Sequence, residues 1–236
     1  LEASYGGFMS TLSEGQDLTP FVASLGKEWE TAQTGFKAYA ACASAHTIID
    51  ALDAMMKRGL TRDNLERLTI GMSKVGINNV GWEYRPTSVV GAQMNGYFTA
   101  AVKLNDGEAF IDQYSEERIA DKAVLGLIPK IEIRHDPELD SGGAAMRHAV
   151  KAQARSSDGR MWEQYVEQRR GSPHHPLSRA ELEQKFRRTA ASALGAQAAE
   201  RLLAAVFDIE RSNDMHVLTA LLKPAAPVQV ARTGRG

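Results

Sequence analysis

Residues 150–167 read VKAQARSSDGRMWEQYVE, and this stretch decides the fold class of the chain. Val150, Ala152 and Ala154 alternate with three polar residues, a pattern that predicts a half-buried strand. The pair Asp158-Gly159 is typical of a two-residue hairpin turn. A return strand over 161–167 completes the prediction, which is an antiparallel hairpin.

Two earlier stretches extend this hairpin to a small sheet. Lys130 to Arg134 alternates apolar with charged residues, and Leu68, Ile70 and Met72 alternate with small and polar ones. The segment at 77–81 is rich in turn residues and is predicted to be a loop. The strands are therefore expected between about 64 and 168.

Helical periodicity dominates the sequence on both sides of these strands. Ser178 and Glu181 form the S-x-x-E pattern of a capping box, and Gly195 is a typical helix stop. The fold class predicted is α+β, with helical segments flanking a small sheet module. The helices expected are short pieces within 1–34, then about 44–57, 86–107, 109–114, 115–127, 178–194, 199–209 and 217–222.

The composition excludes several classes of function. The 28 Lys and Arg residues balance 29 Asp and Glu residues, which argues against a general nucleic-acid binder. No apolar run approaches the ~20 residues of a membrane span, so no membrane partner is expected. Cys42 is the one cysteine of the chain, so no intrachain disulfide is possible and a cytoplasmic location is expected.

The candidate site lies in Gly35–His46, just before the periodic apolar segment Ile48–Met56. A helix capped by Ser44 carries His46 in its first turn, where the positive end of the helix dipole disfavours imidazolium. A neutral histidine with Lys37 nearby is a plausible proton-transfer pair for carboxylate substrates. The same residues allow another interpretation, because His46 shares helical spacing with Ile49 and Leu52 and would then be a satisfied core histidine.

Motifs for other chemistry are missing from the sequence. The six histidines show no metal-ligand spacing, and no phosphate-binding loop, dinucleotide fingerprint or nucleophile elbow is found. Arg85 precedes a predicted helix and is a candidate anion anchor. Gln93 and Asn95 are open to interpretation as ordinary mid-helix polar positions. The remaining polar candidates for substrate binding are Tyr39, Ser44, Arg85, Gln93 and Tyr97.

Four ordered motifs nevertheless resemble one family. They are FKAYAACASAHTIIDA from residue 36, RPTSVVGAQMNGYFTAAVKLNDGEAF from 85, KIEIRHDPELD from 130 and DGRMWEQYVEQRRGSPHHPLSRAELEQKF from 158. In this order they resemble the MmgE/PrpD family, and the resemblance runs from about Tyr5 to Leu222.

The resemblance implies a large helical domain with a smaller α+β lid domain, usually in a dimer. This chain resembles the C-terminal half, which implies the end of the helical domain at 1–60, the lid-type domain at 61–170, closing helices at 171–223 and a flexible tail at 224–236. Its expected partners are a small carboxylate, a second copy in a homodimer, or an N-terminal half that this chain lacks.

The resemblance also implies the chemistry. The family's dehydratases, decarboxylases and epimerases remove or move a proton next to a carboxylate of a small di- or tricarboxylate, without metal or organic cofactor. His46 matches the family's active-site histidine and Lys37 its lysine. A family tyrosine falls on Phe98 unless the register shifts to Tyr97, and a family proline is Ala38 here. The alternative is a non-catalytic truncated module that docks onto a partner half or self-associates.

Overall fold

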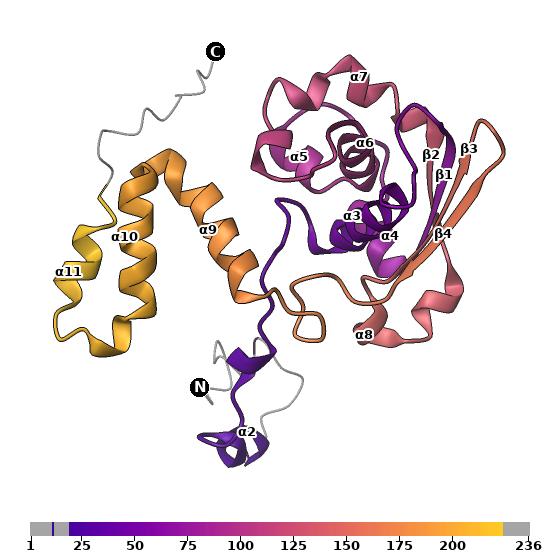
Figure 1. Ribbon diagram of the computed structural model, residues 1–236. Coiled ribbons are helices and arrows are strands. Elements are labelled where there is room, and N and C mark those ends of the chain that lie inside the picture. Colours follow the sequence, from indigo (N-terminus) through magenta and orange to yellow (C-terminus); the bar gives the residue numbers. More distant parts are fainter. Residues whose placement is uncertain (1–10, 12–18, 224–236) are drawn as a thin grey trace. The chain divides into compact units, whose positions relative to one another are not determined.

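One mixed sheet of four strands, in the order β2-β1-β3-β4, organises the structure (Figure 1). The computed structural model describes residue 11 and residues 19–223. The central strand β1 runs parallel to β2 and antiparallel to β3, and β3 pairs antiparallel with β4. The α+β class predicted from the sequence is confirmed. The strands are β1 Leu65–Met72, β2 Ile131–His135, β3 Val150–Ser156 and β4 Met161–Val166.

The chain divides into two units, Leu1–Gly35 and Phe36–Gly236. The first contains α2, Thr19–Ser24, close to the helix start expected there. The predicted tail at 224–236 lies outside the described residues, and the division at 60 and 170 stays a prediction. The helices of the second unit are α3 Ala43–Met56, α4 Lys74–Val80, α5 Val89–Gln93, α6 Gly96–Asp106, α7 Lys122–Leu125, α8 Gly143–Met146, α9 Arg179–Leu194, α10 Ala196–Phe207 and α11 Met215–Ala220.

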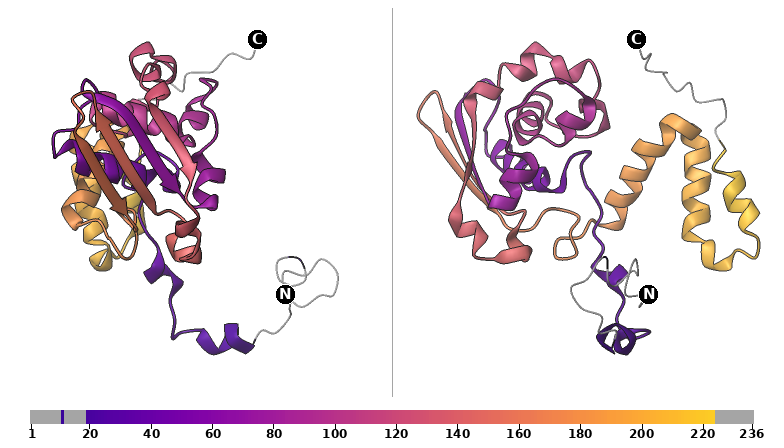
Figure 2. Two further views of the ribbon diagram at one scale, coloured as in Figure 1. Left: turned by 90° about the vertical axis from the view of Figure 1, so that its right-hand side faces the viewer. Right: turned by 180° about the vertical axis from the view of Figure 1, so that it is seen from behind.

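The core lies between one face of the sheet and the helices α3 and α6. Helix α3 contacts β3, β4 and α6, and α6 contacts β2. Ile48, Ile49 and Leu52 of α3 are fully buried against this face. The opposite face is open, since Gln153 and Arg155 point to solvent, and the left view of Figure 2 shows the strands in front of the helices. This one-sided burial explains the alternation in the sequence.

The hairpin turn differs from the prediction by one residue. Strands β3 and β4 are joined by the three-residue loop 157–159, closed by a bond from Ser156 N to Arg160 O at 2.9 Å. Gly159, with φ of 85°, occupies the last position of the loop. A three-residue hairpin needs one residue with positive φ before the return strand, and glycine supplies it without steric cost.

The predicted loop at 77–81 is wrong, because residues 74–80 form α4. Ser73 caps this helix by accepting a hydrogen bond from Gly76 N at 3.1 Å. The same hydroxyl donates to the Arg147 carbonyl at 2.9 Å. The asparagines at 78 and 79 favour turns locally, but the cap and the buried Val80 hold the segment helical.

The helix predicted over 86–107 is interrupted at Met94 and Asn95. Asn95 is fully buried; its Oδ1 accepts from Phe98 N at 3.0 Å and its Nδ2 donates to the Trp82 carbonyl at 2.7 Å. An asparagine that caps a helix competes with continuation of the preceding turn. The result is two helices, α5 and α6, where the periodicity predicted one.

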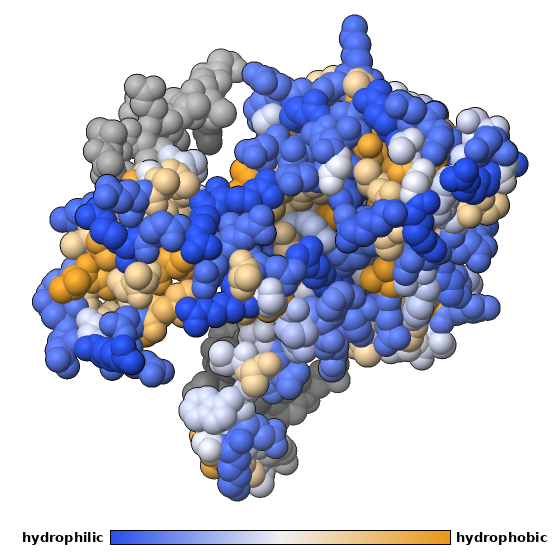
Figure 3. Space-filling model, viewed as in Figure 1, coloured by the Kyte–Doolittle hydropathy of each residue, from blue (hydrophilic) through white to orange (hydrophobic). Residues whose placement is uncertain are grey.

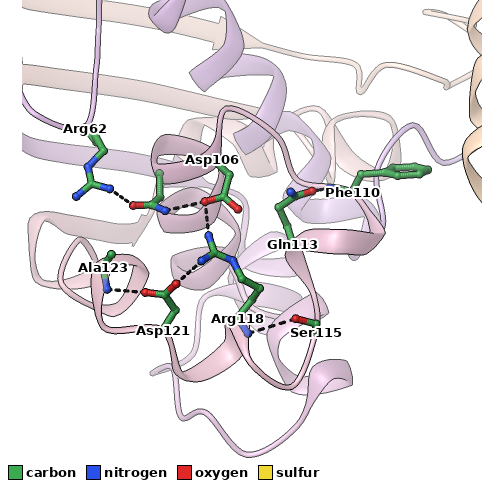
Figure 4. A network of polar contacts seen from close by, with 9 residues as sticks. Arg62, Asp106, Phe110, Gln113, Ser115, Arg118, Asp121 and Ala123 are labelled. Atoms are coloured by element: carbon green, nitrogen blue, oxygen red, sulfur yellow. Dashed lines mark hydrogen bonds and ion pairs between the residues drawn. The ribbon is translucent and has the colours of Figure 1, made fainter. Parts of the chain in front are cut away.

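Arg118 explains why the helix predicted over 115–127 is also broken (Figure 4). Its guanidinium pairs with Asp106 and Asp121, and its backbone N–H donates to Ser115 Oγ at 3.3 Å. Asp121 caps α7 by accepting from Ala123 N at 2.7 Å. These side-chain bonds satisfy backbone donors outside a continuous helix, so a 3₁₀ turn at Arg118–Ala120 and the short α7 replace it.

The closing helices follow the prediction closely. Ser178 and Glu181 form the capping box at the start of α9, and Gly195, with φ of 78°, ends it. Lys185 of α9 donates to the Lys37 carbonyl at 2.7 Å, and Arg188 pairs with Glu108 at 2.9 Å. Helix α9 is therefore tied to the segment that precedes α3.

Candidate active site

The segment from Phe36 to Cys42, called the 36–42 segment below, is held at both ends by backbone hydrogen bonds. Phe36 N donates to the Gly171 carbonyl at 2.7 Å, and Cys42 N donates to the Gln93 carbonyl at 2.8 Å. The segment therefore links the loop before α9 to the end of α5 and leads directly into α3. Its position is fixed by residues more than 50 positions away along the chain.

Lys37 and His46 meet at the Ala41 carbonyl. Lys37 Nζ donates to that oxygen at 3.1 Å, and His46 Nε2 lies 3.3 Å from it. Because a carbonyl oxygen only accepts, Nε2 must carry the proton, and a neutral His46 then has its lone pair on Nδ1. Nδ1 is buried and has no hydrogen-bond partner among the residues that the structure describes.

The pKa of His46 is lowered to about 3. Burial is the largest cause, followed by the charge of Arg169, while the bond to Ala41 opposes the shift; Lys37 and His148 lower the pKa further. The neutral imidazole predicted from the sequence is confirmed, but burial and neighbouring cations hold it neutral rather than the helix dipole. At neutral pH the ring is a bare acceptor at Nδ1.

The interpretation of His46 as a satisfied core histidine accounts for only one of its two ring nitrogens. The side chain is 0% exposed and follows the buried stripe of α3. A satisfied core histidine would have partners at both ring nitrogens, and His46 has one at Nε2 only within the described part of the chain. An unpaired buried acceptor is uncommon and calls for an explanation.

Tyr39 joins His46 to the half-buried carboxyl group of Asp50. Its ring packs edge-on against His46 with centroids 5.1 Å apart, and its hydroxyl donates to Asp50 Oδ1 at 2.5 Å. Asp50 Oδ2 accepts from Arg170 N at 2.9 Å. Burial raises the pKa of Asp50, and burial with the Asp50 charge raises the pKa of Tyr39. Tyr39 is thereby fixed as a hydrogen-bond donor.

Ser44 is not the helix cap that the sequence predicted. Helix α3 begins one residue earlier, after Cys42, whose side chain makes no capping bond. The buried Ser44 hydroxyl instead accepts from Asn79 Nδ2 at 3.0 Å and shares a hydrogen bond with His148 Nδ1 at 3.0 Å. The hydroxyl that the local pattern predicted as a helix cap is thus bound by two distant residues, one in α4 and one just before β3.

His148 and Arg169 are neighbours of the site that sequence reasoning missed. His148 Nε2 accepts from Arg147 Nε at 3.1 Å, so Nδ1 carries the proton and donates to Ser44 Oγ. Burial, with the charges of Arg147 and Arg169, lowers the pKa of His148 to about 4. Arg169 lies within the fourth quoted motif, but no spacing connects either residue to His46, and only their positions beside β3 and after β4 bring them to α3.

Within the described part of the chain, no hydrogen bond or ring contact joins the other predicted side chains to His46. Arg85 is exposed and pairs with Glu83 at 3.3 Å, and no helix begins until Val89. Tyr97 Oη contacts the backbone of Ile133 in β2, at 3.4 and 3.5 Å. Gln93 reaches the site through its backbone carbonyl on Cys42. Their roles in substrate binding stay predictions.

A cavity of about 250 Å³ opens beside Tyr39. Its cations are already engaged, since Lys103 pairs with Asp53 at 2.9 Å and Arg170 with Glu181. Within the described residues, no group of three or more His, Cys, Asp or Glu side chains is placed to hold a metal ion. The described part also contains no helix whose length and apolarity would suffice to cross a membrane.

Known proteins provide an independent comparison. The chain is 28% identical over 235 residues to the cis-aconitate decarboxylase-like protein oryM of Aspergillus oryzae, and 28% over 238 residues to a cis-aconitate decarboxylase of Aspergillus terreus. It is 27% identical over 237 residues to the cis-aconitate decarboxylase of Homo sapiens. These alignments cover 94%, 94% and 98% of this chain but 48% of each relative.

The chain thus spans about half the length of the curated relatives it matches. A model of the MmgE/PrpD C-terminal domain matches residues 39–210, which include the 36–42 segment from Tyr39 onward, α3, the sheet and α9. The resemblance found in the sequence motifs is confirmed over most of the chain. The chain belongs to the MmgE/PrpD family and corresponds to the C-terminal domain of that family.

Proposed function

We propose that this chain forms one wall of the active site of a lyase or isomerase that acts on small di- or tricarboxylates. One observation carries the proposal: His46 is neutral, its Nδ1 is bare and buried, and Lys37 holds the same Ala41 carbonyl that fixes the ring. Its relatives are named for the decarboxylation of cis-aconitate, a tricarboxylate. Dehydration and epimerisation begin with removal of a proton next to a carboxylate, whereas decarboxylation leaves a carbanion that must take up a proton. One acid/base group next to the substrate can serve all three reactions.

In a dehydration or epimerisation, His46 Nδ1 would take the proton next to a substrate carboxylate and then give it to the leaving hydroxyl or back to the same carbon. In a decarboxylation, the protonated ring would give its proton to the carbanion that the loss of carbon dioxide leaves. A pKa of about 3 makes the isolated ring a weak base. A bound carboxylate would raise the pKa of His46, because opposite charge nearby favours the imidazolium form. Lys37 would stabilise the negative charge that develops on the substrate when the proton leaves. The step is proton transfer by side chains, so we propose no metal or organic cofactor for it.

We further propose that the opposite wall comes from outside this chain, either from a second copy or from the region that matches the rest of the relatives. Helices α10 and α11, with the residues that follow each of them, expose a group of apolar side chains, and Figure 3 shows this apolar surface. The exposed side chains of this surface are Val206, Phe207, Ile209, Met215, Val217 and Leu222. Contiguous exposed apolar surface favours association.

We also propose the cytoplasm as the compartment of the protein, because a chain with one cysteine fits a reducing compartment.

The test is an activity assay of the chain, alone and together with the separately produced non-matching half of the Aspergillus oryzae relative. Loss of cis-aconitate and formation of products are followed by chromatography. We expect turnover when both halves are present and its loss in His46→Gln, which keeps an N–H for the Ala41 carbonyl but has no ring base. Arg155→Gln is the matched control, because Arg155 points to solvent on the face of the sheet opposite to α3. Equal turnover in His46→Gln would refute the assignment of His46.

The exposed apolar surface also favours a second candidate, a non-catalytic module that docks onto a partner half or self-associates. Size-exclusion chromatography with light scattering distinguishes the two. Association without turnover of any di- or tricarboxylate supports the docking module, whereas a monomer with lyase activity excludes it.

A further inference from the structure

Two buried side-chain atoms lack a hydrogen-bond partner among the described residues, and both belong to one cluster. They are His46 Nδ1 and Arg169 Nη1. The first is an acceptor, since Nε2 carries the ring proton. The second is a charged donor. Leaving a buried guanidinium nitrogen without a partner is costly. The presence of a free donor and a free acceptor in the same cluster therefore needs an explanation.

The backbone places Arg169 alongside the turn of α3 that carries His46. Arg170 N donates to Asp50 at 2.9 Å, and Asp50 lies four residues after His46, on the same face of α3. The residue after Arg170, Gly171, accepts a hydrogen bond from Phe36 N. The two residues that follow Arg169 thus anchor it where α3 meets the 36–42 segment. The lowered pKa values of His46 and His148 both include the Arg169 charge as a cause, in agreement with this position.

We propose that Arg169 binds a carboxylate group of the ligand and presents the neighbouring C–H or O–H proton to His46 Nδ1. A carboxylate accepts from the free guanidinium N–H but has nothing to donate to Nδ1. The group next to the carboxylate has the hydrogen that Nδ1 lacks. Guanidinium is planar and matches the two oxygens of a carboxylate better than an ammonium does. This inference rests on the proposed function, because it names the anchor of that same site.

Entry to this position requires a movement of the 36–42 segment. His46 and the free nitrogen of Arg169 are both buried, and the cavity of about 250 Å³ reaches Tyr39 but not His46. Tyr39 both lines that cavity and packs edge-on against His46. Displacing the Tyr39 ring would expose Nδ1.

The experiment uses the whole chain labelled with ¹⁵N in histidine and arginine. The saturated tricarboxylate tricarballylate, inorganic phosphate and buffer alone are compared by the ¹⁵N resonances of His46 and the guanidinium groups. We expect tricarballylate, and not phosphate, to shift both sets. In Arg169→Gln the affinity should fall about tenfold to hundredfold, the loss expected for a charge-assisted hydrogen bond. Arg155→Gln is the matched control, since Arg155 points to solvent on the open face of the sheet, and it should bind like the wild type.

Arg169→Lys keeps the test decisive if Arg169→Gln fails to fold. Lysine retains the charge without the planar fork, so binding should weaken several-fold. Wild-type affinity in a folded Arg169 variant overturns the inference. Equal shifts with phosphate and with tricarballylate also overturn it, and so does the absence of any shift with tricarballylate. The inference fails as well if only an ordered water joins the two atoms.

The outcome is separable from that of the proposed function. Binding that depends on Arg169 in a protein without turnover would refute the enzymatic proposal alone. Turnover that Arg169→Gln leaves unchanged would refute the inference alone.

Discussion

Lys37 Nζ and His46 Nε2 approach the same atom, the carbonyl oxygen of Ala41, at 3.1 and 3.3 Å. Lys37 is exposed and His46 is fully buried, so one backbone oxygen joins a surface ammonium to an interior ring. That oxygen determines which ring nitrogen carries the proton. The chemistry available at Nδ1 is therefore a consequence of the backbone path of the 36–42 segment.

The buried imidazole predicts how stability depends on pH. The pKa of His46 is about 3 in the folded protein and near 6.5 in the unfolded chain. Below pH 6.5 the unfolded chain binds a proton that the folded protein does not, so the free energy of unfolding falls as the pH falls toward 3. The contribution of His46 is about 1.4 kcal/mol per pH unit. Asp50, whose pKa is raised, acts in the opposite direction.

Urea unfolding of the wild type and of His46→Gln at pH 6.5, 6.0, 5.5 and 5.0 checks this prediction. Glutamine cannot take up the proton, so the variant should lose about 1.4 kcal/mol per pH unit of the slope. Identical slopes in the two proteins would show that His46 is protonated in the folded state.

The hydroxyl of Tyr39 is expected to contribute measurably to stability. It donates to the half-buried carboxylate of Asp50 at 2.5 Å, so Tyr39→Phe should reduce the free energy of unfolding by about 2 kcal/mol. In an Asp50→Asn background the same substitution should cost about 1 kcal/mol, because the acceptor is then neutral. Tyr97→Phe is the matched control; its contacts of 3.4 and 3.5 Å are long, and it should cost under about 1 kcal/mol. A cost for Tyr97→Phe equal to that for Tyr39→Phe would contradict this ranking.

Asn95 is expected to be the most sensitive of the helix caps. Asn95→Ala removes the cap of α6 and also the hydrogen bond from this buried side chain to the Trp82 carbonyl, so the loss should be about 2 to 3 kcal/mol. Ser88→Ala removes the cap of α5 at an exposed position and should cost about 1 kcal/mol. Thermal unfolding of both variants decides the matter, and similar shifts in Tm would argue against a role for the Trp82 bond.

The sequence predicted those parts of the fold whose signals are local. The capping box at Ser178, the stop at Gly195 and the alternation in β3 depend on neighbouring residues, and the structure contains each of them. The errors arose where a distant partner decides. The loop expected at 77–81 is helical because Ser73, which caps it, is held by the distant Arg147 carbonyl and Val80 is buried. The helix over 86–107 breaks because Asn95 binds the Trp82 carbonyl.

The candidate site shows the same division. Periodicity placed His46 on a helix and the helix dipole predicted a neutral ring, but neither could supply burial and neighbouring cations as the causes. Arg169 and His148 come from the far end of the sheet module, 100 or more residues along the chain, and no spacing connects them to His46. Only pairing between β3 and β4 and the packing of α3 on them bring these charges to the ring.

Two glycines with the same backbone angle allow a final test of the 36–42 segment. Gly171 and Gly159 both have φ of 85°. A methyl group at Gly159 meets nothing within 4 Å, whereas one at Gly171 collides with the Phe36 carbonyl oxygen. Gly159→Ala should therefore cost only the strain of positive φ, about 1 to 2 kcal/mol. Gly171→Ala should cost at least about 1 kcal/mol more, because overlap with a backbone atom forces a shift.

Besides stability, the two glycine variants are compared by the ¹⁵N resonances of His46, which report on the site itself. Displacing Phe36 moves the segment that carries Lys37 and Ala41, so Gly171→Ala should change the ¹⁵N resonances of the His46 ring while Gly159→Ala leaves them unchanged. Urea unfolding gives the energies, and the spectra are recorded on the same samples. Equal losses of stability together with unchanged His46 resonances in both variants would show that the contact between Gly171 and Phe36 does not position the Ala41 carbonyl.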